Sequence, residues 1–340
     1  MKYNTLGQTG LLVSEICLGT MTFAAGEGMW KPIAGVDQDG VDQLLKMSFD
    51  AGVNFVDTAD VYTNGESEKT LAQAIVNTGI ARKDIVVATK AFSRMGPGRN
   101  DVGASRGHIM DAVEASLRRL RTDYIDLYQI HASDTITPIE ETLRALDTLV
   151  SQGKVRYIGC SNWYAWQLMK ALGLSESKNL AKMCTIQSFY SLAGRDLERE
   201  IVPLLKDQGT GLLVWSPLAG GLLSGKFSRE NQTPEESRRS TFDFPIVDKE
   251  RAWRILDVLR PVAAAHETGV ATVALAWVLA KPFVTSVIIG AKRPDQLQQN
   301  LASVNLRLSA EEIARLDEAS ALPPEYPGWM IPRQNATRLG

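Results

Sequence analysis

Short apolar runs alternate with longer amphipathic segments along most of the chain. The runs have the length and composition of buried strands, whereas the segments between them repeat apolar positions with the period of a helix. The strands expected are Ile16–Gly19, Asn54–Asp57, Ile85–Lys90, Tyr124–His131, Val155–Ser161, Thr185–Gln187, Gly211–Trp215 and Val284–Gly290. The helices expected include Gly40–Ala51, Ser105–Leu120, Pro138–Gln152, Leu197–Gln208 and Asp248–Glu267. This alternation predicts an α/β protein with parallel strands joined by helices.

The number of strands decides between two architectures. Eight strands at intervals of mostly about thirty residues are typical of a (β/α)8 TIM barrel. An open doubly wound sheet also alternates strands and helices, but its GxGxxG dinucleotide fingerprint is absent after the first strand, where the chain reads CLGTM (17–21). No linker divides the chain, so we expect one barrel domain over residues 1–340.

The segments outside this alternation predict additions to the barrel. The first fifteen residues, with the turn-forming Gly7 and Gly10, predict an N-terminal β-hairpin that closes the lower end of the barrel. The polar loop Ser228–Pro245 precedes the last strand and is the candidate lid. A C-terminal helix and a tail from Leu322, rich in proline and aromatic residues, follow that strand, and the tail is expected to fold across the barrel mouth.

Composition narrows the class of function. The 340 residues are 44% hydrophobic and 22% charged, enough for a large core, and the net charge of −2 includes no basic tract. Nucleic acid and anionic membranes are therefore not expected as partners. The first residues lack the apolar core of a signal peptide, no apolar run is long enough to span a bilayer, and Cys17, Cys160 and Cys184 stand singly. We expect a reduced, cytoplasmic protein, and the oligomeric state is left open.

Polar or aromatic residues close six consecutive strands. A structural core would not select them, and in a barrel these strand ends all face the rim where barrel enzymes carry out their chemistry. The residues are Asp57, Lys90, His131, Ser161 with Asn162, Gln187 and Trp215. A single buried histidine or glutamine usually belongs to a satisfied core, but six such positions in register predict an active site.

Three of these residues, together with Tyr62, suit proton transfer. Lys90 is expected to pair with Asp57, which offsets the cost of burying both charges. An ammonium group ~4 Å from Tyr62 in an effective dielectric of ~20 is worth about 4 kcal/mol, or roughly three pKa units at most, so we expect a lowered pKa for Tyr62. Tyr62 then serves as a general acid, and His131 hydrogen-bonds the same substrate oxygen. Such a site protonates a carbonyl oxygen while a nucleophile attacks its carbon.

The nucleophile is expected to come from a bound molecule. No activated serine or cysteine is evident, and the three histidines lack metal-binding spacing, so no metal site is expected. Ser161, Asn162 and Gln187 offer groups that would fix a carboxamide, and Trp215 offers a flat face for stacking. These four residues predict a nicotinamide whose hydride attacks the carbonyl carbon.

Two further segments suit phosphate groups. Gly220–Lys226 matches part of a P-loop, but Phe227 replaces the hydroxyl residue that binds magnesium, which argues against nucleotide hydrolysis. This loop either covers a pyrophosphate or is an ordinary glycine turn. Pro294 is expected to open a helix with Lys292 and Arg293 at its mouth, either as a site for the 2′-phosphate of NADP or as a solvated surface pair. Of the two dinucleotides, we expect NADP.

Together these motifs are recognisable. The chain resembles the aldo-keto reductase superfamily along essentially its whole length, in the segments LGTMTF, NFVDTADVY, VVATK, YQIH, GCSN, TIQSFYSL, WSPLAGGLLSGK and GAKRPDQLQQN. The resemblance implies a (β/α)8 barrel that binds extended NADP(H) without a Rossmann domain. It also implies a catalytic tetrad of Asp57, Tyr62, Lys90 and His131, with Tyr62 as the proton donor.

The resemblance also implies a set of cofactor-binding residues. Asn162 and Gln187 match carboxamide-binding positions, and Trp215 matches the position that stacks on the nicotinamide. In having a tryptophan there, the chain resembles the branch that includes aflatoxin-aldehyde reductases and potassium-channel β subunits. Gln296 and Gln299 stand where arginine and glutamate are frequent in the family. The full set expected is Gly19, Thr20, Asp57, Ser161, Asn162, Gln187, Trp215, Ser216, Pro217, Leu218, Gly220, Lys226, Gly290, Lys292, Arg293, Gln296, Gln299 and Asn300.

The expected function is the NADPH-dependent reduction of aldehydes or ketones to alcohols. Large apolar side chains near the rim favour aryl or bulky substrates unless they are packing anchors. They are Phe23, Met29, Trp30, Trp163 and, in the tail, Trp329. Two alternatives stay open: a cofactor-sensing binding subunit with vestigial turnover, and a lyase that uses Lys90 as a Schiff-base lysine.

Overall fold

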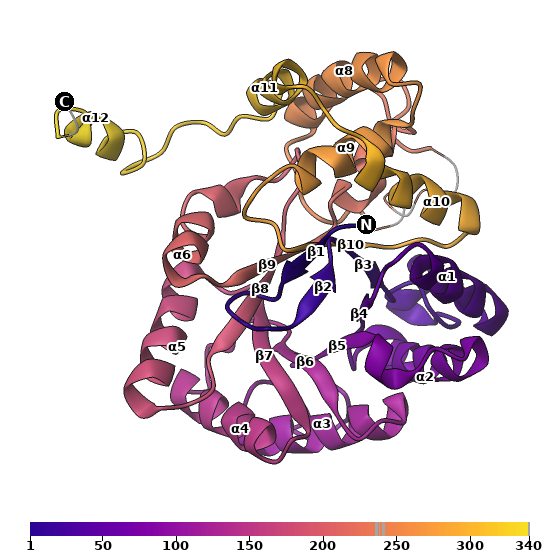
Figure 1. Ribbon diagram of the computed structural model, residues 1–340, viewed down its shortest axis with the longest axis vertical. Coiled ribbons are helices and arrows are strands. Elements are labelled where there is room, and N and C mark those ends of the chain that lie inside the picture. The colour runs from indigo at the N-terminus through magenta and orange to yellow at the C-terminus, as the bar shows by residue number, and fades with distance from the viewer. Residues whose placement is uncertain (235–236, 238, 240–241, 339–340) are drawn as a thin grey trace.

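The eight expected strands close into a parallel barrel (Figure 1). The computed structural model describes residues 1–338 except 235–236, 238 and 240–241. The barrel strands are β3 (Ile16–Gly19), β4 (Phe55–Asp57), β5 (Val86–Ala91), β6 (Ile125–Ile130), β7 (Val155–Ser161), β8 (Met183–Phe189), β9 (Gly211–Trp215) and β10 (Ser286–Ile289). Their order around the sheet is β10-β3-β4-β5-β6-β7-β8-β9, and every neighbouring pair is parallel. The predicted (β/α)8 barrel is confirmed.

Helices cover the outside of the barrel (Figure 1). They are α1 (Gln38–Asp50), α2 (Glu66–Thr78), α3 (Arg106–Leu120), α4 (Ile139–Ser151), α5 (Ala165–Lys178), α6 (Ile201–Gln208), α8 (Lys249–Ala265), α9 (Val270–Leu279), α10 (Pro294–Ala302) and α11 (Ala310–Ala319). A short further helix, α12 (Ile331–Asn335), lies in the C-terminal tail, away from the barrel. Side-chain caps set some of the starts: Asp37 accepts a hydrogen bond from the Gly40 N–H at α1, and Ser105 accepts one from the His108 N–H at α3.

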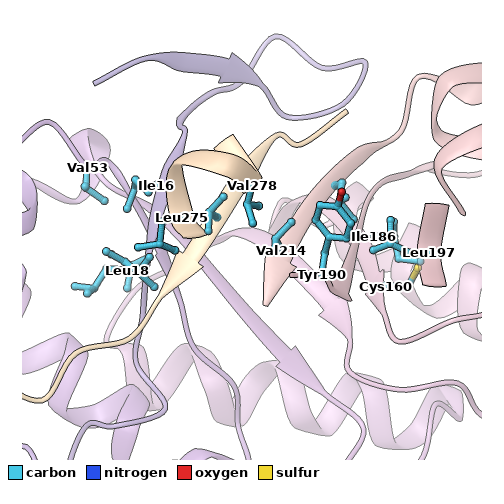
Figure 2. Close-up of a cluster of buried hydrophobic side chains, with 14 of the residues drawn as sticks. Ile16, Leu18, Val53, Cys160, Ile186, Tyr190, Leu197, Val214, Leu275 and Val278 are labelled. Atoms are coloured by element: carbon cyan, nitrogen blue, oxygen red, sulfur yellow. The ribbon is translucent and has the colours of Figure 1, made fainter. Parts of the chain in front are cut away.

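Both faces of the barrel wall are apolar, which explains the nearly continuous apolar runs of the sequence. Alternate residues of each strand point inward and outward. The inner cluster includes Cys17, Phe55, Leu127, Leu213 and Ile288. The outer cluster, between the strands and the surrounding helices, includes Ile16, Leu18 and Val214 of the wall with Leu275 and Val278 of α9 (Figure 2).

A hairpin closes the lower end of the barrel, as predicted. Its strands β1 (Tyr3–Thr5) and β2 (Leu12–Ser14) pair antiparallel, and Leu6 at the turn is fully buried in the inner cluster. The Asn4 side chain donates to the carbonyl oxygen of Thr285, immediately before β10. These contacts lie at the amino ends of the barrel strands, opposite the rim that carries the polar residues.

Gly7→Ala is expected to lower the free energy of unfolding by at least about 2 kcal/mol. The φ of Gly7 is +61°, and an added Cβ would lie 2.2 Å from the carbonyl oxygen of Cys184, so left-handed strain and steric overlap act together. Gly10→Ala is the matched control on the same hairpin, because nothing lies within 4 Å of a Cβ there. Urea denaturation measures both variants, and two equal midpoints would contradict this account.

The C-terminal tail was expected to cross the barrel mouth, and this expectation is wrong. After α11 the tail extends away from the barrel and ends in α12, which buries none of its residues (Figure 1). Arg199 binds Glu325 at 2.9 Å and directs the start of the tail. Two consecutive prolines, Pro323 and Pro324, favour an extended chain at this point. Trp329, in this tail, is 54% exposed.

Across the described residues, no single helix combines the length and apolarity of a bilayer span, and the α8–α9 pair, which passes such a test only jointly, meets at a 99° bend. Cys17, Cys160 and Cys184 are all free thiols. Burial raises the pKa of the Cys160 thiol, and it raises that of Cys184 to about 12. Neither thiol is therefore an activated nucleophile.

Candidate active site

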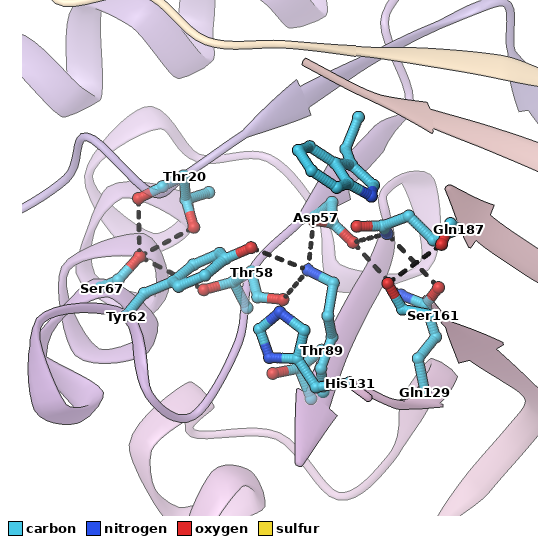
Figure 3. A network of polar contacts seen from close by, with 12 residues as sticks. Thr20, Asp57, Thr58, Tyr62, Ser67, Thr89, Gln129, His131, Ser161 and Gln187 are labelled. Atoms are coloured by element: carbon cyan, nitrogen blue, oxygen red, sulfur yellow. Dashed lines mark hydrogen bonds and ion pairs between the residues drawn. The ribbon is translucent and has the colours of Figure 1, made fainter. Parts of the chain in front are cut away.

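The four residues of the expected tetrad converge at the carboxyl ends of β4, β5 and β6 (Figure 3). The ammonium nitrogen of Lys90 lies 2.5 Å from Asp57 Oδ2 and 3.2 Å from the hydroxyl oxygen of Tyr62. It also donates to the carbonyl oxygen of Thr58 at 2.8 Å. Lys90 is fully buried and Asp57 nearly so, which makes this a desolvated ion pair with a phenol at its side.

A strained turn places Tyr62 at this position. Tyr62 opens the short 3-10 helix η2 (Tyr62–Gly65), in which Thr63, Asn64 and Gly65 have φ values of +46°, +55° and +91°. These consecutive left-handed residues turn the chain from β4 into α2, at a cost for the two non-glycine residues of about 1–2 kcal/mol each. Such strain persists where surrounding contacts determine the conformation, and it is common at functional sites.

Two aromatic rings contact Tyr62. Trp30 of η1 (Gly28–Trp30) and His131 each meet its ring edge to face, with centroids 5.8 Å apart. Trp30 is 6% exposed and therefore forms a wall beside the phenol. The contact with His131 brings the imidazole to the same end of the barrel as the hydroxyl of Tyr62 (Figure 3).

Amide groups complete the coordination of Asp57. Gln187 Nε2 donates to Asp57 Oδ1 at 2.9 Å, and Gln129 Nε2 donates to the same oxygen at 3.2 Å. These bonds, with the ion pair to Lys90, offset the desolvation of the carboxylate. Sequence reasoning missed Gln129. Its signal was its place two residues before His131, which puts both side chains on the inner face of the barrel.

The pKa of Tyr62 is raised, whereas the sequence predicted a lowered pKa. Burial raises it above the usual value, Lys90 lowers it, and Asp57 raises it, with a net increase. The sequence argument counted the attraction of Lys90 alone and omitted the desolvation of a fully buried phenol. For Lys90, burial lowers the pKa, but Asp57 and Tyr62 outweigh that effect and raise it, so the lysine stays charged.

His131 is a neutral imidazole. Burial and the charge of Lys90 lower its pKa to about 3. Within the described part of the chain, its Nδ1 is buried without a hydrogen-bond partner. The residue therefore suits hydrogen bonding to a substrate oxygen, but it cannot act as a charged acid near neutral pH.

The opposite side of the mouth gathers amide and indole groups. Asn162, directly after β7, donates from Nδ2 to the carbonyl oxygen of His131 at 3.1 Å and accepts from Trp215 Nε1 at 2.9 Å. The Ser161 hydroxyl donates to the carbonyl oxygen of Gln187 at 3.0 Å. The four residues predicted to hold a nicotinamide thus lie together at one side of the mouth.

Phenyl rings flank Trp215. Phe244 stacks on the indole with centroids 5.6 Å apart and an interplanar angle of 7°, and Phe189 lies tilted against it at 5.2 Å. Phe242 contacts Phe244 and also packs against the apolar cluster around Trp30 and Tyr62. The described part of the candidate lid therefore reaches the mouth, while residues 235–236, 238 and 240–241 of that loop lie outside the described residues.

The segment after β9 forms glycine turns. The 3-10 helix η5 (Ala219–Ser224) contains Gly220 and Gly221 with φ values of +67° and +93°, and no α-helix follows at once. This geometry differs from a nucleotide-hydrolysing P-loop, in which a helix begins at the phosphate. Ser216 Oγ accepts the Gly220 N–H at 2.8 Å, and Lys226 is exposed. Pro217 and Leu218 lie between β9 and η5.

The segment after β10 opens α10 at Pro294, as predicted. Lys292 Nζ donates to the carbonyl oxygen of Ala34 at 3.0 Å, and Arg293 pairs with Asp295 at 3.0 Å. The remaining expected positions lie in or beside this segment: Gln296 accepts the Lys292 N–H, Asn300 donates to the Gly290 carbonyl oxygen, and Gln299 is exposed.

Some expected positions lie in closely packed surroundings. Thr20 is fully buried and its hydroxyl pairs with Ser67, while a Cβ at Gly19 would lie 2.7 Å from Ile288. Phe23 is fully buried in the core. Trp163 is buried and donates to the Ala132 carbonyl oxygen. Of the apolar side chains considered for the substrate pocket, Met29 is exposed at the rim, and Trp30 lies against Tyr62.

No cluster of three or more histidine, cysteine, aspartate or glutamate residues that could hold a metal ion occurs in the part of the chain that is described. The flat face of Trp215 and the nearby amides fit a nicotinamide. The Phe244 ring stacks in parallel on one face of the indole, which is the geometry that a flat ring adopts there. The side chains of Ser161, Asn162 and Gln187 supply the hydroxyl and amide groups that a carboxamide requires.

Comparison with known proteins places this geometry in context. Residues 15–321 match the sequence model of the Aldo/keto reductase family. A probable voltage-gated potassium channel subunit beta of Arabidopsis thaliana is 39% identical, over 90% of this chain and 92% of the relative. The uncharacterized oxidoreductase YrpG of Bacillus subtilis is 36% identical, over 97% of this chain and 100% of the relative. The versiconal hemiacetal acetate reductase of Aspergillus parasiticus is 33% identical, over 96% and 99%.

Proposed function

The chain belongs to the aldo/keto reductase family, and on this basis we propose that it is an NADPH-dependent oxidoreductase that reduces an aldehyde or ketone to an alcohol, with Tyr62 as the proton donor. The observation that carries the proposal is the 3.2 Å contact between the ammonium group of Lys90 and the Tyr62 hydroxyl. A phenol held beside a permanent cation suits donation of a proton to an oxygen that gains negative charge.

The raised pKa of Tyr62 is compatible with this role. An alkoxide is about as basic as hydroxide and is a far stronger base than a phenolate, since the pKa of an ordinary phenol is about 10. Proton transfer from Tyr62 to a forming alkoxide is therefore favourable even when burial weakens the acid. Lys90 stabilises the phenolate that remains, and neutral His131 orients the substrate oxygen by hydrogen bonding.

A bound reduced nicotinamide would supply the hydride that the carbonyl carbon receives. Trp215 would provide its stacking face, and Ser161, Asn162 and Gln187 would bind its carboxamide. Ser216, Pro217, Leu218, Gly220 and Lys226 are the candidates for pyrophosphate contact, and Lys292 and Arg293 at the mouth of α10 are the candidates for the 2′-phosphate.

The walls of the mouth suggest the substrate class. Trp30 contacts the ring of Tyr62, and Phe242 packs against the same cluster from the opposite loop. Aromatic walls on two sides of the acid favour aryl or bulky carbonyl compounds over small polar sugars. A panel of aldehydes, ketones and alcohols, assayed with NADPH and NADH side by side, tests the proposed function. Consumption of NADPH by an aryl aldehyde such as a nitrobenzaldehyde is the expected result.

Two other functions remain as proposals to be tested. The similarity to proteins named as potassium channel β subunits favours a cofactor-sensing binding subunit as the second candidate. Tight NADPH binding without turnover across the panel would select it. The contacts within the tetrad favour catalysis instead. The Schiff-base lyase is disfavoured because the raised pKa keeps Lys90 charged, and borohydride trapping with substrate would reveal it.

Arg293→Ala is expected to weaken NADPH binding roughly ten- to hundredfold while NADH binding changes little, because a charge-assisted contact to the 2′-phosphate is lost. Isothermal titration with both dinucleotides measures the difference. Lys46→Ala is the matched control, since Lys46 also forms an exposed ion pair, with Asp50 on α1. An equal loss of affinity for both dinucleotides would exclude Arg293 as the residue that distinguishes them.

A further inference from the structure

A buried carboxyl group outside the tetrad lies two residues before Tyr62, at the start of the loop that carries it. Asp60 is fully buried, and neither of its carboxyl oxygens has a side-chain partner in the described part of the chain. Its backbone N–H donates to the carbonyl oxygen of Lys90 at 3.0 Å, which ties the residue to β5. Aspartate is seldom fully buried without a paired side chain, and the mechanism proposed above does not use this carboxyl group.

The elements packed around Asp60 present several titratable groups. Glu68 on α2 is also fully buried and accepts from Thr89 Oγ1 and from Arg119 Nε, each at 2.6 Å. Arg119 on α3 is thus engaged by Glu68, while Lys90 on β5 is engaged by Asp57. Tyr128 on β6 is buried nearby, and its hydroxyl has no partner among the described residues.

Two buried carboxyl groups therefore lie close enough to repel each other, and Arg119 forms its ion pair with Glu68. Like charges in a poorly solvated site cannot both ionise cheaply, so one of the two groups retains its proton. Burial raises the pKa of Asp60 to about 7, and repulsion from Glu68 contributes, against smaller opposing effects of Arg119, the Val61 backbone N–H and Lys90. Glu68 holds the direct ion pair, and Asp60 is the group that titrates near neutral pH.

The charge state of Asp60 affects Tyr62 in two ways, one electrostatic and one steric. An ionised Asp60 raises the pKa of Tyr62, which makes the phenol a weaker acid. The second route is steric: a Cβ added at Gly65 would lie 2.8 Å from Arg119 Cδ, so Arg119 packs closely against the left-handed turn that holds Tyr62. An ionised Asp60 would attract Arg119, the side chain that packs against that turn.

We propose that Asp60 is a positioning residue, protonated in the active state, whose ionisation weakens Tyr62 as an acid and so slows the reaction. The proposal rests on the proposed function for its kinetic consequence. The buried cluster of Asp60, Glu68 and Arg119 and its contact with the Tyr62 turn do not depend on that function.

Stability gives a first test that needs no substrate. Asp60 titrates near pH 7 in the folded chain but near ~3.9 when unfolded, so the wild-type protein loses stability as the pH rises from about 4 to about 7, and the loss is constant above that. Asp60→Asn removes this loss. The difference in thermal midpoint, variant minus wild type, is expected to grow through that pH window. Asp126→Asn, which removes a carboxylate paired with Arg82, is the matched control and is expected to destabilise at neutral pH.

The closing experiment observes Tyr62 itself. The ring-hydroxyl carbon of Tyr62, assigned by its loss in Tyr62→Phe, is followed by NMR in tyrosine-labelled protein between about pH 5 and about pH 9. A step near pH 7 in the wild type that is absent in Asp60→Asn and Asp60→Ala is expected. A step in all three proteins, or in none, would overturn the proposal.

The pH dependence of kcat is measured in the same proteins. If the carbonyl panel yields a substrate, kcat of the wild type is expected to fall about tenfold as Asp60 ionises, the equivalent of one pKa unit, while Asp60→Asn gives a flat profile there. A shared inflection in both profiles would overturn the proposal. Failure of the whole panel would instead contradict the proposed reductase activity, whereas the NMR step of Tyr62 reports on the coupling regardless of turnover.

Discussion

Tyr62→Phe is expected to lower kcat for carbonyl reduction by at least about 100-fold, because a positioned general acid typically contributes 10²–10⁴-fold to a rate. The substitution removes only the hydroxyl that lies 3.2 Å from Lys90, and it leaves the ring contacts with Trp30 and His131 in place. Cofactor affinity, which does not depend on this hydroxyl in the proposed arrangement, is expected to be unchanged. Steady-state kinetics and isothermal titration with NADPH measure the two quantities separately.

Tyr190→Phe is the control for the loss of a buried phenol. Its hydroxyl donates to Glu198 at 2.6 Å, away from the tetrad, so stability decreases but the rate per folded molecule does not. Wild-type turnover by Tyr62→Phe would show that the proton comes from another group. Loss of both turnover and NADPH binding would show that Tyr62 shapes the cofactor site instead.

Lys90→Met is expected to lower the free energy of unfolding by about 3–5 kcal/mol and to abolish turnover, because it leaves the Asp57 carboxylate buried without its counter-ion. The Lys90 side chain is 0% exposed, and it donates to Asp57, Thr58 and Tyr62. The amides of Gln129 and Gln187 remain on Asp57 but carry no charge to compensate it.

The double variant Asp57→Asn/Lys90→Met separates stability from catalysis. It removes both charges, so most of the lost stability is expected to return, while turnover stays absent because Tyr62 has lost its cation. Urea denaturation and the reductase assay give the two readouts. A double variant no more stable than Lys90→Met would mean that the two charges do not depend on each other.

The site could be located from the sequence because strand ends carry a clear signal. Strands such as Val155–Ser161 and Gly211–Trp215 have the predicted bounds, since a parallel strand buried on both faces is a nearly continuous apolar run. A polar residue that closes such a run is conspicuous, and parallel strands bring all of their carboxyl ends to one rim. Asp57, Lys90 and His131 were therefore predicted as one group without knowledge of their distances.

Features that depend on contacts between distant segments were not predictable in this way. Gln129 lies inside a strand, and its bond to Asp57 spans 72 positions of the chain. Phe244 reaches Trp215 only because a loop folds back over the mouth. The tail was expected to follow the same course, but its ion pair with Arg199 directs it away from the barrel.

Local pattern determined the architecture of this protein and the strand-end members of the proposed tetrad, because hydrophobic period and strand-end chemistry are properties of neighbouring residues. Tertiary structure decided the electrostatics. The direction of the Tyr62 pKa shift depends on how much water is excluded and on which charges surround the phenol, and these come from β4, β5 and the loop after β4 at once. The same is true of Asp60, whose proton is held by the proximity of Glu68 and by burial that no stretch of sequence displays.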